Sequence, residues 1–166
     1  RLTGKTTKTN GRQVSIVFQE PRLMPWLTVR QNMAFALLKE KNRQKADAAV
    51  ERLLNVLGLT EFQDAFPSQI SGGMAQRTAL GRTLCFDPDI ILMDLSMPKM
   101  DGLETLKILK RNNPDIHVII LTGHATVENG IRATLSGAEE ILEKPSNVDM
   151  LIRKIEKLVT KKMVKI

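Results

Sequence analysis

The sequence predicts an α/β fold, with a parallel sheet, flanking helices and an additional helical subdomain. From residue 88 onward, short apolar segments alternate with amphipathic helical ones, and strands that are joined through helices run parallel. Before residue 86, one short apolar strand precedes a long stretch with helical periodicity. No Gly/Ser/Pro-rich linker separates these two patterns, so we expect the change to occur inside continuous secondary structure.

Composition favours a cytoplasmic protein with an ordinary core. At 166 residues the chain can bury a core without disulfides or metals. One cysteine, Cys85, and two distant histidines, His117 and His124, exclude a disulfide framework and a recognisable zinc spacing. No apolar run approaches the ~20 residues of a membrane span, and none at the start of the sequence suits a signal peptide.

The net charge of +7 raises the question of a nucleic-acid partner. The lysines are dispersed, and the densest cluster falls on an expected C-terminal helix over 147–161 that has an apolar face opposite. A solvated helix face is the favoured interpretation, with a phosphate-binding patch as the alternative. Aromatic residues are only 4% of the chain, which is few for stacking on bases, so no nucleic acid is expected.

In the first part of the chain, QVSIVFQ (13–19) predicts a buried strand that ends at Glu20-Pro21. Thr28 is suited to cap a helix, a second helix ends at Gly58, and a third apolar-faced segment begins directly after Ser71. The first two helices present apolar faces made of Val29, Met33, Leu37 and Leu38, and of Ala46, Ala49, Val50, Leu53, Leu54 and Leu57.

In the second part, strands are expected over 89–94, 116–122 and 140–143, and helices over 103–112, 127–136 and 147–161. Asp94, Thr122 and Lys144 fall at the carboxyl ends of these strands. Open α/β sheets bind ligands at that edge, so these side chains are candidates for one site.

Two stretches of the first part, IVFQEPRLMPWLTVRQNM (16–33) and ISGGMAQRTALGRTL (70–84), resemble the ATP-binding subunits of ABC transporters, most closely importers of the nitrate, sulfonate or taurine type. The resemblance implies that Gln19 senses metal and γ-phosphate, and that Ser71, Gly72 and Gly73 close over the ATP of a partner subunit. It also implies that the segment through Trp26 faces a membrane permease, which would place the chain peripherally at the inner membrane.

The residues of the second stretch, 70–84, also suit phosphate binding independently of the family resemblance. A glycine pair lets the backbone approach an anion, and the N-terminus of the following helix offers unpaired N–H groups to phosphate. The alternative is that Ser71 merely caps a helix and that the glycines form a turn.

The expected nucleotide loop is missing from this sequence. Gly4-Lys5-Thr6 lacks the first glycine and the strand of the phosphate-binding loop, so we interpret the N-terminal residues as a surface loop. Leu95 stands where the ABC family has its catalytic glutamate. ATPase activity of this chain alone is therefore not expected, and ATP would be bound only together with a partner subunit.

Residues 88–158 resemble the C-terminal part of a response-regulator receiver domain, which has a flavodoxin-like fold. The resemblance implies that Asp94 is the phosphoacceptor, that Thr122 and Lys144 contact the phosphoryl group, and that a histidine kinase or a small phosphodonor is the partner. Each residue also has a simpler interpretation: a strand-end cap, a β-former and an exposed charge.

The receiver's opening strand, with its acidic magnesium ligands, is not recognisable here. We hypothesise that strand 14–18 substitutes for it beside strand 89–94. Gln19 and Glu20 would then lie near Asp94, and Glu20 and Asp94 would form a weak Mg²⁺ site. Up to Asp94, the ABC interpretation as a magnesium ligand stays open.

The predicted division is an ABC ATPase segment over 1–86 and a partial receiver over 87–166. Three functions follow: a phosphoacceptor signalling module, an ATP-binding component of an ABC importer, or a folded chimeric scaffold with neither activity. Both sites are expected to be incomplete. Self-association through the helical segment 28–66 is a further expectation.

Overall fold

The computed structural model describes residues 7–9, 12–94, 102–123, 126–144, 153 and 155. The predicted helix over 147–161 is described only at Arg153 and Ile155, which are helical. Its lysine cluster, together with Leu95, His124 and the tripeptide at 4–6, lies outside the described residues.

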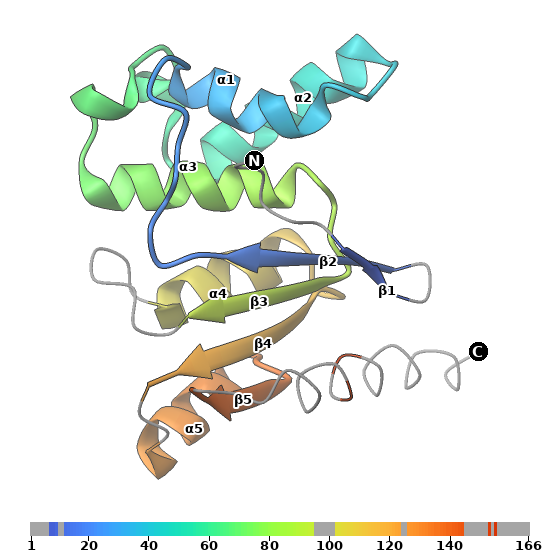
Figure 1. Ribbon diagram of the computed structural model, residues 1–166, viewed down its shortest axis with the longest axis vertical. Coiled ribbons are helices and arrows are strands. Elements are labelled where there is room, and N and C mark those ends of the chain that lie inside the picture. The colour runs from blue at the N-terminus through green and yellow to red at the C-terminus, as the bar shows by residue number, and fades with distance from the viewer. Residues whose placement is uncertain are drawn as a thin grey trace.

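In the described part of the chain, the core of the fold is a sheet of five strands in the order β1-β2-β3-β4-β5 (Figure 1). The strands are β1 (Thr7–Thr9), β2 (Arg12–Val17), β3 (Ile90–Asp94), β4 (His117–Thr122) and β5 (Glu140–Glu143). Strands β2 to β5 are parallel, and β2 pairs with β3 from Val14↔Ile90 to Val17↔Met93. The predicted pairing of strand 14–18 with strand 89–94 is therefore confirmed.

Strand β1 corrects the prediction that the N-terminal residues form a surface loop. The structure pairs β1 antiparallel with β2, and the register places Thr9 opposite Arg12. Asn10-Gly11 are the two residues between them, and this dipeptide is a strong signal for a two-residue hairpin loop. Thr7 and Thr9 also favour extended backbone because they are β-branched.

Helices connect the parallel strands in the expected alternation. Between β2 and β3 lie α1 (Val29–Ala34), a 3₁₀ turn η1 (Phe35–Leu37), α2 (Arg43–Val56), two further turns η2 (Thr60–Phe62) and η3 (Pro67–Gln69), and α3 (Gly72–Leu84). Helices α4 (Gly102–Asn112) and α5 (Val127–Leu135) form the next two connections. The α/β class with flanking helices and a helical subdomain is thus confirmed.

Most predicted helix ends are correct. Thr28 caps α1 through a capping box with Gln31, and Gly58, with φ of +64°, follows the end of α2. The first helix is shorter than expected, because its apolar periodicity continues into the 3₁₀ turn η1 at Phe35.

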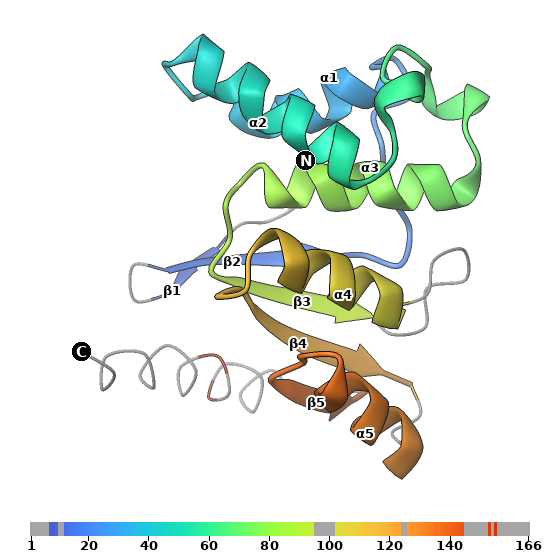
Figure 2. The same cartoon turned by 180° about the vertical axis from the view of Figure 1, so that it is seen from behind.

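The sheet buries both faces. On one face, Ile91 and Met93 pack in a cluster that also contains residues of α3, α4 and α5. Figure 2 shows α4 and α5 lying over this face of the sheet. On the other face, Val14, Ile90 and Leu92 pack with Ile155. Helices α1, α2 and α3 form a layer beyond the β2 side of the sheet. Among the described residues, no helix is long and apolar enough to span a bilayer.

Candidate functional site

Three predicted site residues meet at the carboxyl edge of the sheet. Asp94 ends β3 and pairs with Leu121 in register, and Thr122 ends β4 and pairs with Glu143. The backbone N–H of Lys144 donates to the carbonyl of Thr122 at 2.8 Å, which fixes the residue after β5 beside the end of β4. Parallel strands that end in register explain why residues far apart in the sequence lie together here.

The Lys144 ammonium donates a hydrogen bond to the Asp94 carboxylate, and the two form an ion pair. The Asp94 side chain is 8% exposed, whereas the Lys144 side chain is 43% exposed. A buried carboxylate requires a polar or charged partner, and the Lys144 ammonium is one that the structure places against Asp94. The pair places a cation beside a carboxylate at the carboxyl edge of the sheet.

Gln19 and Glu20 lie just beyond the carboxyl end of β2. This strand is the neighbour of β3, which ends at Asp94. The Glu20 side chain is 81% exposed and its carboxylate lies 3.9 Å from the guanidinium of Arg22. Within the described ranges, no three carboxylate, histidine or cysteine side chains form a cluster that could hold a metal ion. The proximity of Glu20 to Asp94 as joint metal ligands stays a prediction.

The loop after β2 is attached to α3 by two residues that sequence reasoning did not single out. Gln76 donates from its side-chain amide to the carbonyl of Gln19. Arg82 donates to the carbonyls of Pro21 and Arg22, each at 3.1 Å, and burial lowers the pKa of its guanidinium. Both residues lie in the quoted stretch 70–84, but their long-range partners could not be read from it.

Ser71 is the N-cap of α3, and its hydroxyl accepts a hydrogen bond from the N–H of Met74 at 3.2 Å. Gly72 and Gly73 are the first residues of the helix, not part of a turn. Ser71 is exposed and the two glycines are half-buried. The capping role of Ser71 is thus present in the structure, and contact with nucleotide stays a prediction.

Comparison with known proteins finds two families. The family model of the response regulator receiver domain matches residues 48–156. The curated relatives are instead ATP-binding proteins of transporters. An uncharacterised ABC transporter ATP-binding protein of Methanocaldococcus jannaschii is 42% identical over 110 residues, which is 66% of this chain and 41% of the relative. An aliphatic sulfonates import ATP-binding protein of Xanthomonas axonopodis pv. citri is 39% identical and covers 64% of this chain and 43% of its own length.

A solved structure that is similar to this chain is also an ATP-binding cassette. The ADP- and phosphate-bound dimer of the ATP-binding cassette MJ0796 superposes with a TM-score of 0.61 at 26% identity, covering 78% of this chain and 57% of the cassette. The chain spans about two fifths of the length of these curated relatives.

The receiver match begins at residue 48, and an ABC match of 110 residues is longer than the predicted segment 1–86. The residues matched by the receiver family and those matched by the ABC relative therefore overlap in the middle of the chain. The boundary at residue 86 stays a prediction.

Proposed function

The chain belongs to the response-regulator receiver family and also carries sequence of ABC transporter ATP-binding type, and from this chimeric make-up we propose that its Asp94 accepts a phosphoryl group. The observation that supports the proposal most directly is the ion pair of Lys144 and Asp94 at the carboxyl edge of the parallel sheet. Thr122, which is buried at the end of the intervening strand β4, is the proposed hydroxyl donor.

In the proposed reaction, a carboxylate oxygen of Asp94 attacks the phosphorus of a phosphodonor such as acetyl phosphate. A P–O bond forms to Asp94, the P–O bond to acetate breaks, and acetate leaves with the electron pair. Lys144 then compensates the added charge on the phosphoryl group, and Thr122 donates a hydrogen bond to one of its oxygens. A histidine kinase is the alternative donor.

Magnesium normally assists phosphoryl transfer by neutralising charge on the phosphate. The described residues do not fit a resident metal site, because Glu20 is exposed beside Arg22 and no third carboxylate joins it. Glu20 and Asp94 are at most a weak site, so we expect phosphorylation to be slow and to depend on Lys144.

The test is binding of beryllofluoride in the presence of Mg²⁺, followed by NMR, together with mass spectrometry after incubation with acetyl phosphate. We expect saturable shifts at the ends of β3, β4 and β5 and addition of one phosphoryl group. Asp94→Asn should abolish both, while Asp115→Asn, a change at an exposed aspartate outside the site, should leave both intact. Equal behaviour of these two variants would refute the assignment.

A second proposal rests on the ABC similarity. Gln19 and the segment Ser71 to Gly73 would contact nucleotide held by a partner subunit beside a membrane permease, because the two curated relatives named above are ATP-binding proteins of transporters. The exposed N-terminus of α3 suits an anion. Photo-crosslinking of an azido-ATP to this segment, lost in Ser71→Arg and retained in Ser68→Arg, would support this proposal; labelling at other sites only would reject it.

A further inference from the structure

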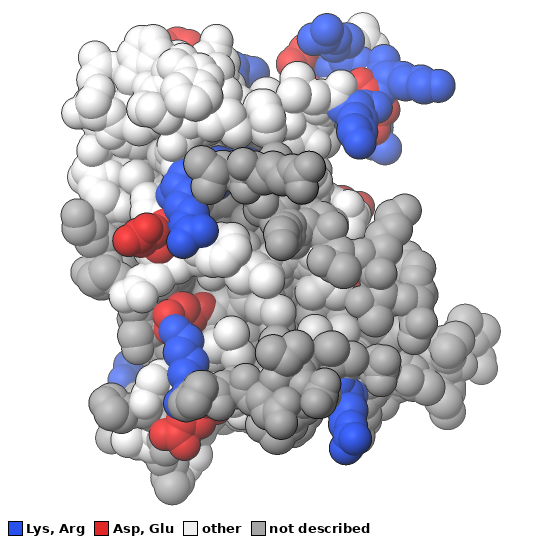
Figure 3. All heavy atoms as spheres, viewed as in Figure 1, with Lys and Arg blue, Asp and Glu red and all other residues white. Residues whose placement is uncertain are grey.

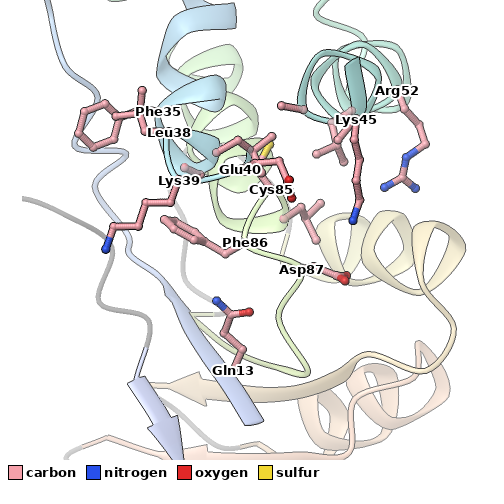
Figure 4. Close-up of a pocket in the computed structure, with 16 residues that line it drawn as sticks. Gln13, Phe35, Leu38, Lys39, Glu40, Lys45, Arg52, Cys85, Phe86 and Asp87 are labelled. Atoms are coloured by element: carbon pink, nitrogen blue, oxygen red, sulfur yellow. The ribbon is translucent and has the colours of Figure 1, made fainter. Parts of the chain in front are cut away.

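A cavity of about 1090 Å³ lies between α2 and the end of α3 (Figure 4). Its floor includes Gln13, near the start of β2, and Asp87, which precedes β3. The cavity therefore opens at the amino edge of the sheet, opposite the edge that carries Asp94. It is a feature that the proposed phosphoacceptor function does not use.

Small side chains create this space. Ala46 and Ala49 lie on the face of α2 that lines the cavity, next to Leu53 one turn further along. The opposite wall is formed by Leu84, Cys85 and Phe86. These apolar surfaces suit the hydrocarbon part of a small molecule.

Lys45 and Arg52 are seven residues apart on α2, so they lie on the same face of the helix, and both line the cavity. The Arg52 guanidinium donates to the side-chain oxygen of Asn112 at 2.9 Å. In the part of the chain that the structure describes, the Lys45 ammonium has no ion-pair partner. Figure 4 shows it extending from α2 toward the side of the cavity where Asp87 lies.

The charges around the cavity favour an anion. Two carboxylates line it, Glu40 and Asp87, against three cations, Lys39, Lys45 and Arg52. Glu40 accepts a hydrogen bond from the N–H of Asn42 at 3.0 Å, so it is engaged with its own loop. Figure 3 shows Lys and Arg side chains gathered at the tip of the helical layer, where α2 begins.

We propose that this cavity binds a small free monocarboxylate with an apolar tail, of the medium-chain fatty acid class. The carboxylate lies against Lys45 with Arg52 nearby, and the tail packs between Ala49 and the wall formed by Leu84 and Phe86.

The chemistry of Cys85 is consistent with this orientation. Burial raises the pKa of its thiol to about 12, while the positive charge of Arg52 acts in the opposite direction. The thiol is therefore neutral at physiological pH and does not repel an anion.

The experiment compares octanoate, its neutral analogue octanol, and acetate as ligands of the full chain, with amide NMR shifts of α2 and α3 as the readout. We expect octanoate to bind at least about tenfold more tightly than octanol, and acetate not to saturate. Lys45→Gln should bring octanoate to within about threefold of octanol. Arg43→Gln, a matched change on the same helix outside the cavity lining, should leave the preference intact.

Ala49→Phe, which fills the cavity, should abolish binding of both octanoate and octanol while the thermal unfolding transition is retained. Equal affinities of the wild-type chain for octanoate and octanol, or an unchanged preference in Lys45→Gln, would overturn the proposal. So would saturable shifts confined to residues outside the cavity. The readout does not involve Asp94, so failure here is separate from failure of the phosphoacceptor assignment.

Discussion

Asn32 has no exposure to solvent, and its side-chain amide organises the loop that precedes α1. Its oxygen accepts from the N–H of Met24 at 2.8 Å, and its nitrogen donates to the carbonyls of Met24, Leu27 and Thr28 at 2.9–3.1 Å. The loop also carries Trp26, which is 71% exposed. One buried amide thus replaces the backbone pairing that an irregular loop lacks.

We predict that Asn32→Ala lowers the free energy of unfolding by about 3 kcal/mol, because the Met24 N–H and the Leu27 carbonyl lose the partners that the buried amide supplies. Urea unfolding measures this loss, and a fall in Trp26 fluorescence anisotropy should accompany it as the loop loosens. Asn55→Ala, a change at an exposed asparagine of α2, should stay within about 0.5 kcal/mol of the wild type. Similar losses in both variants would contradict this role.

Cys85 gives the stability a specific pH dependence. Burial raises the pKa of its thiol from 9.0 to about 12, so the unfolded chain loses this proton first as the pH rises. The contribution to stability is complete below pH 9 and is lost progressively between pH 9 and about 12, at about 1.4 kcal/mol per pH unit. Comparing chemical unfolding of the wild type and of Cys85→Ala across this range isolates the effect. Parallel pH profiles would show that the thiol does not contribute.

Among the elements, α3 packs against both α1 and α2. Gly81 of α3 lies close to Met33 of α1 and to Leu57, the C-cap of α2. A Cβ atom added at Gly81 would lie 2.5 Å from the terminal methyl of Met33 and 2.9 Å from a methyl of Leu57. Both neighbours are buried, so the space for adjustment is small.

We therefore predict that Gly81→Ala destabilises the protein by about 1–2 kcal/mol, because the overpacking exceeds the gain in helix propensity. Gly130→Ala on α5 is the matched control, since nothing lies within 4 Å of the added Cβ atom. That variant should be stabilised by about 0.5–1 kcal/mol. Thermal or urea unfolding measures both, and the same sign for both changes would contradict the packing argument.

The helix and strand pattern shows why some elements could be predicted and others could not. Thr28, Gly58 and Ser71 act locally, through caps and a positive φ, so the sequence near them was sufficient. Strand β1 is polar and gains its structure by pairing with β2, so hydrophobic periodicity could not find it.

The same distinction applies to the site. Asp94, Thr122 and Lys144 could be placed together because parallel strands align their carboxyl ends. The contact of Gln76 with Gln19 spans 57 residues and depends on how α3 packs against the end of β2. The cavity beside Ala49 likewise follows from the packing of α2 over the end of α3, and alanines on a helix face do not reveal it in the sequence.

At the scale of the whole molecule, the two parts of the chimera share the larger of its two hydrophobic clusters. A single cluster of buried side chains includes Leu53 and Leu80 from the helical subdomain together with Met93 and Leu109 from the later part of the chain. Strand β2 is hydrogen-bonded to β3 within one sheet, and Arg52 of α2 bonds to Asn112 of α4. Cores shared in this way unfold together, since neither part retains its apolar cover alone.

We accordingly predict one cooperative unfolding transition, and that Leu80→Ala weakens both parts equally. Leu80 is fully buried, and its truncation should cost about 2–5 kcal/mol. Native-state hydrogen exchange reports this by element: amides of α2 and of β4 should lose the same free energy of protection, although Leu80 lies in neither. Leu135→Ala on α5, at a side chain that is 83% exposed, should change neither. If α2 lost protection while β4 kept it, the helical subdomain and the sheet would be separate folding units, and the substitution of β2 for a receiver strand would be a contact between two units instead of the basis of one fold.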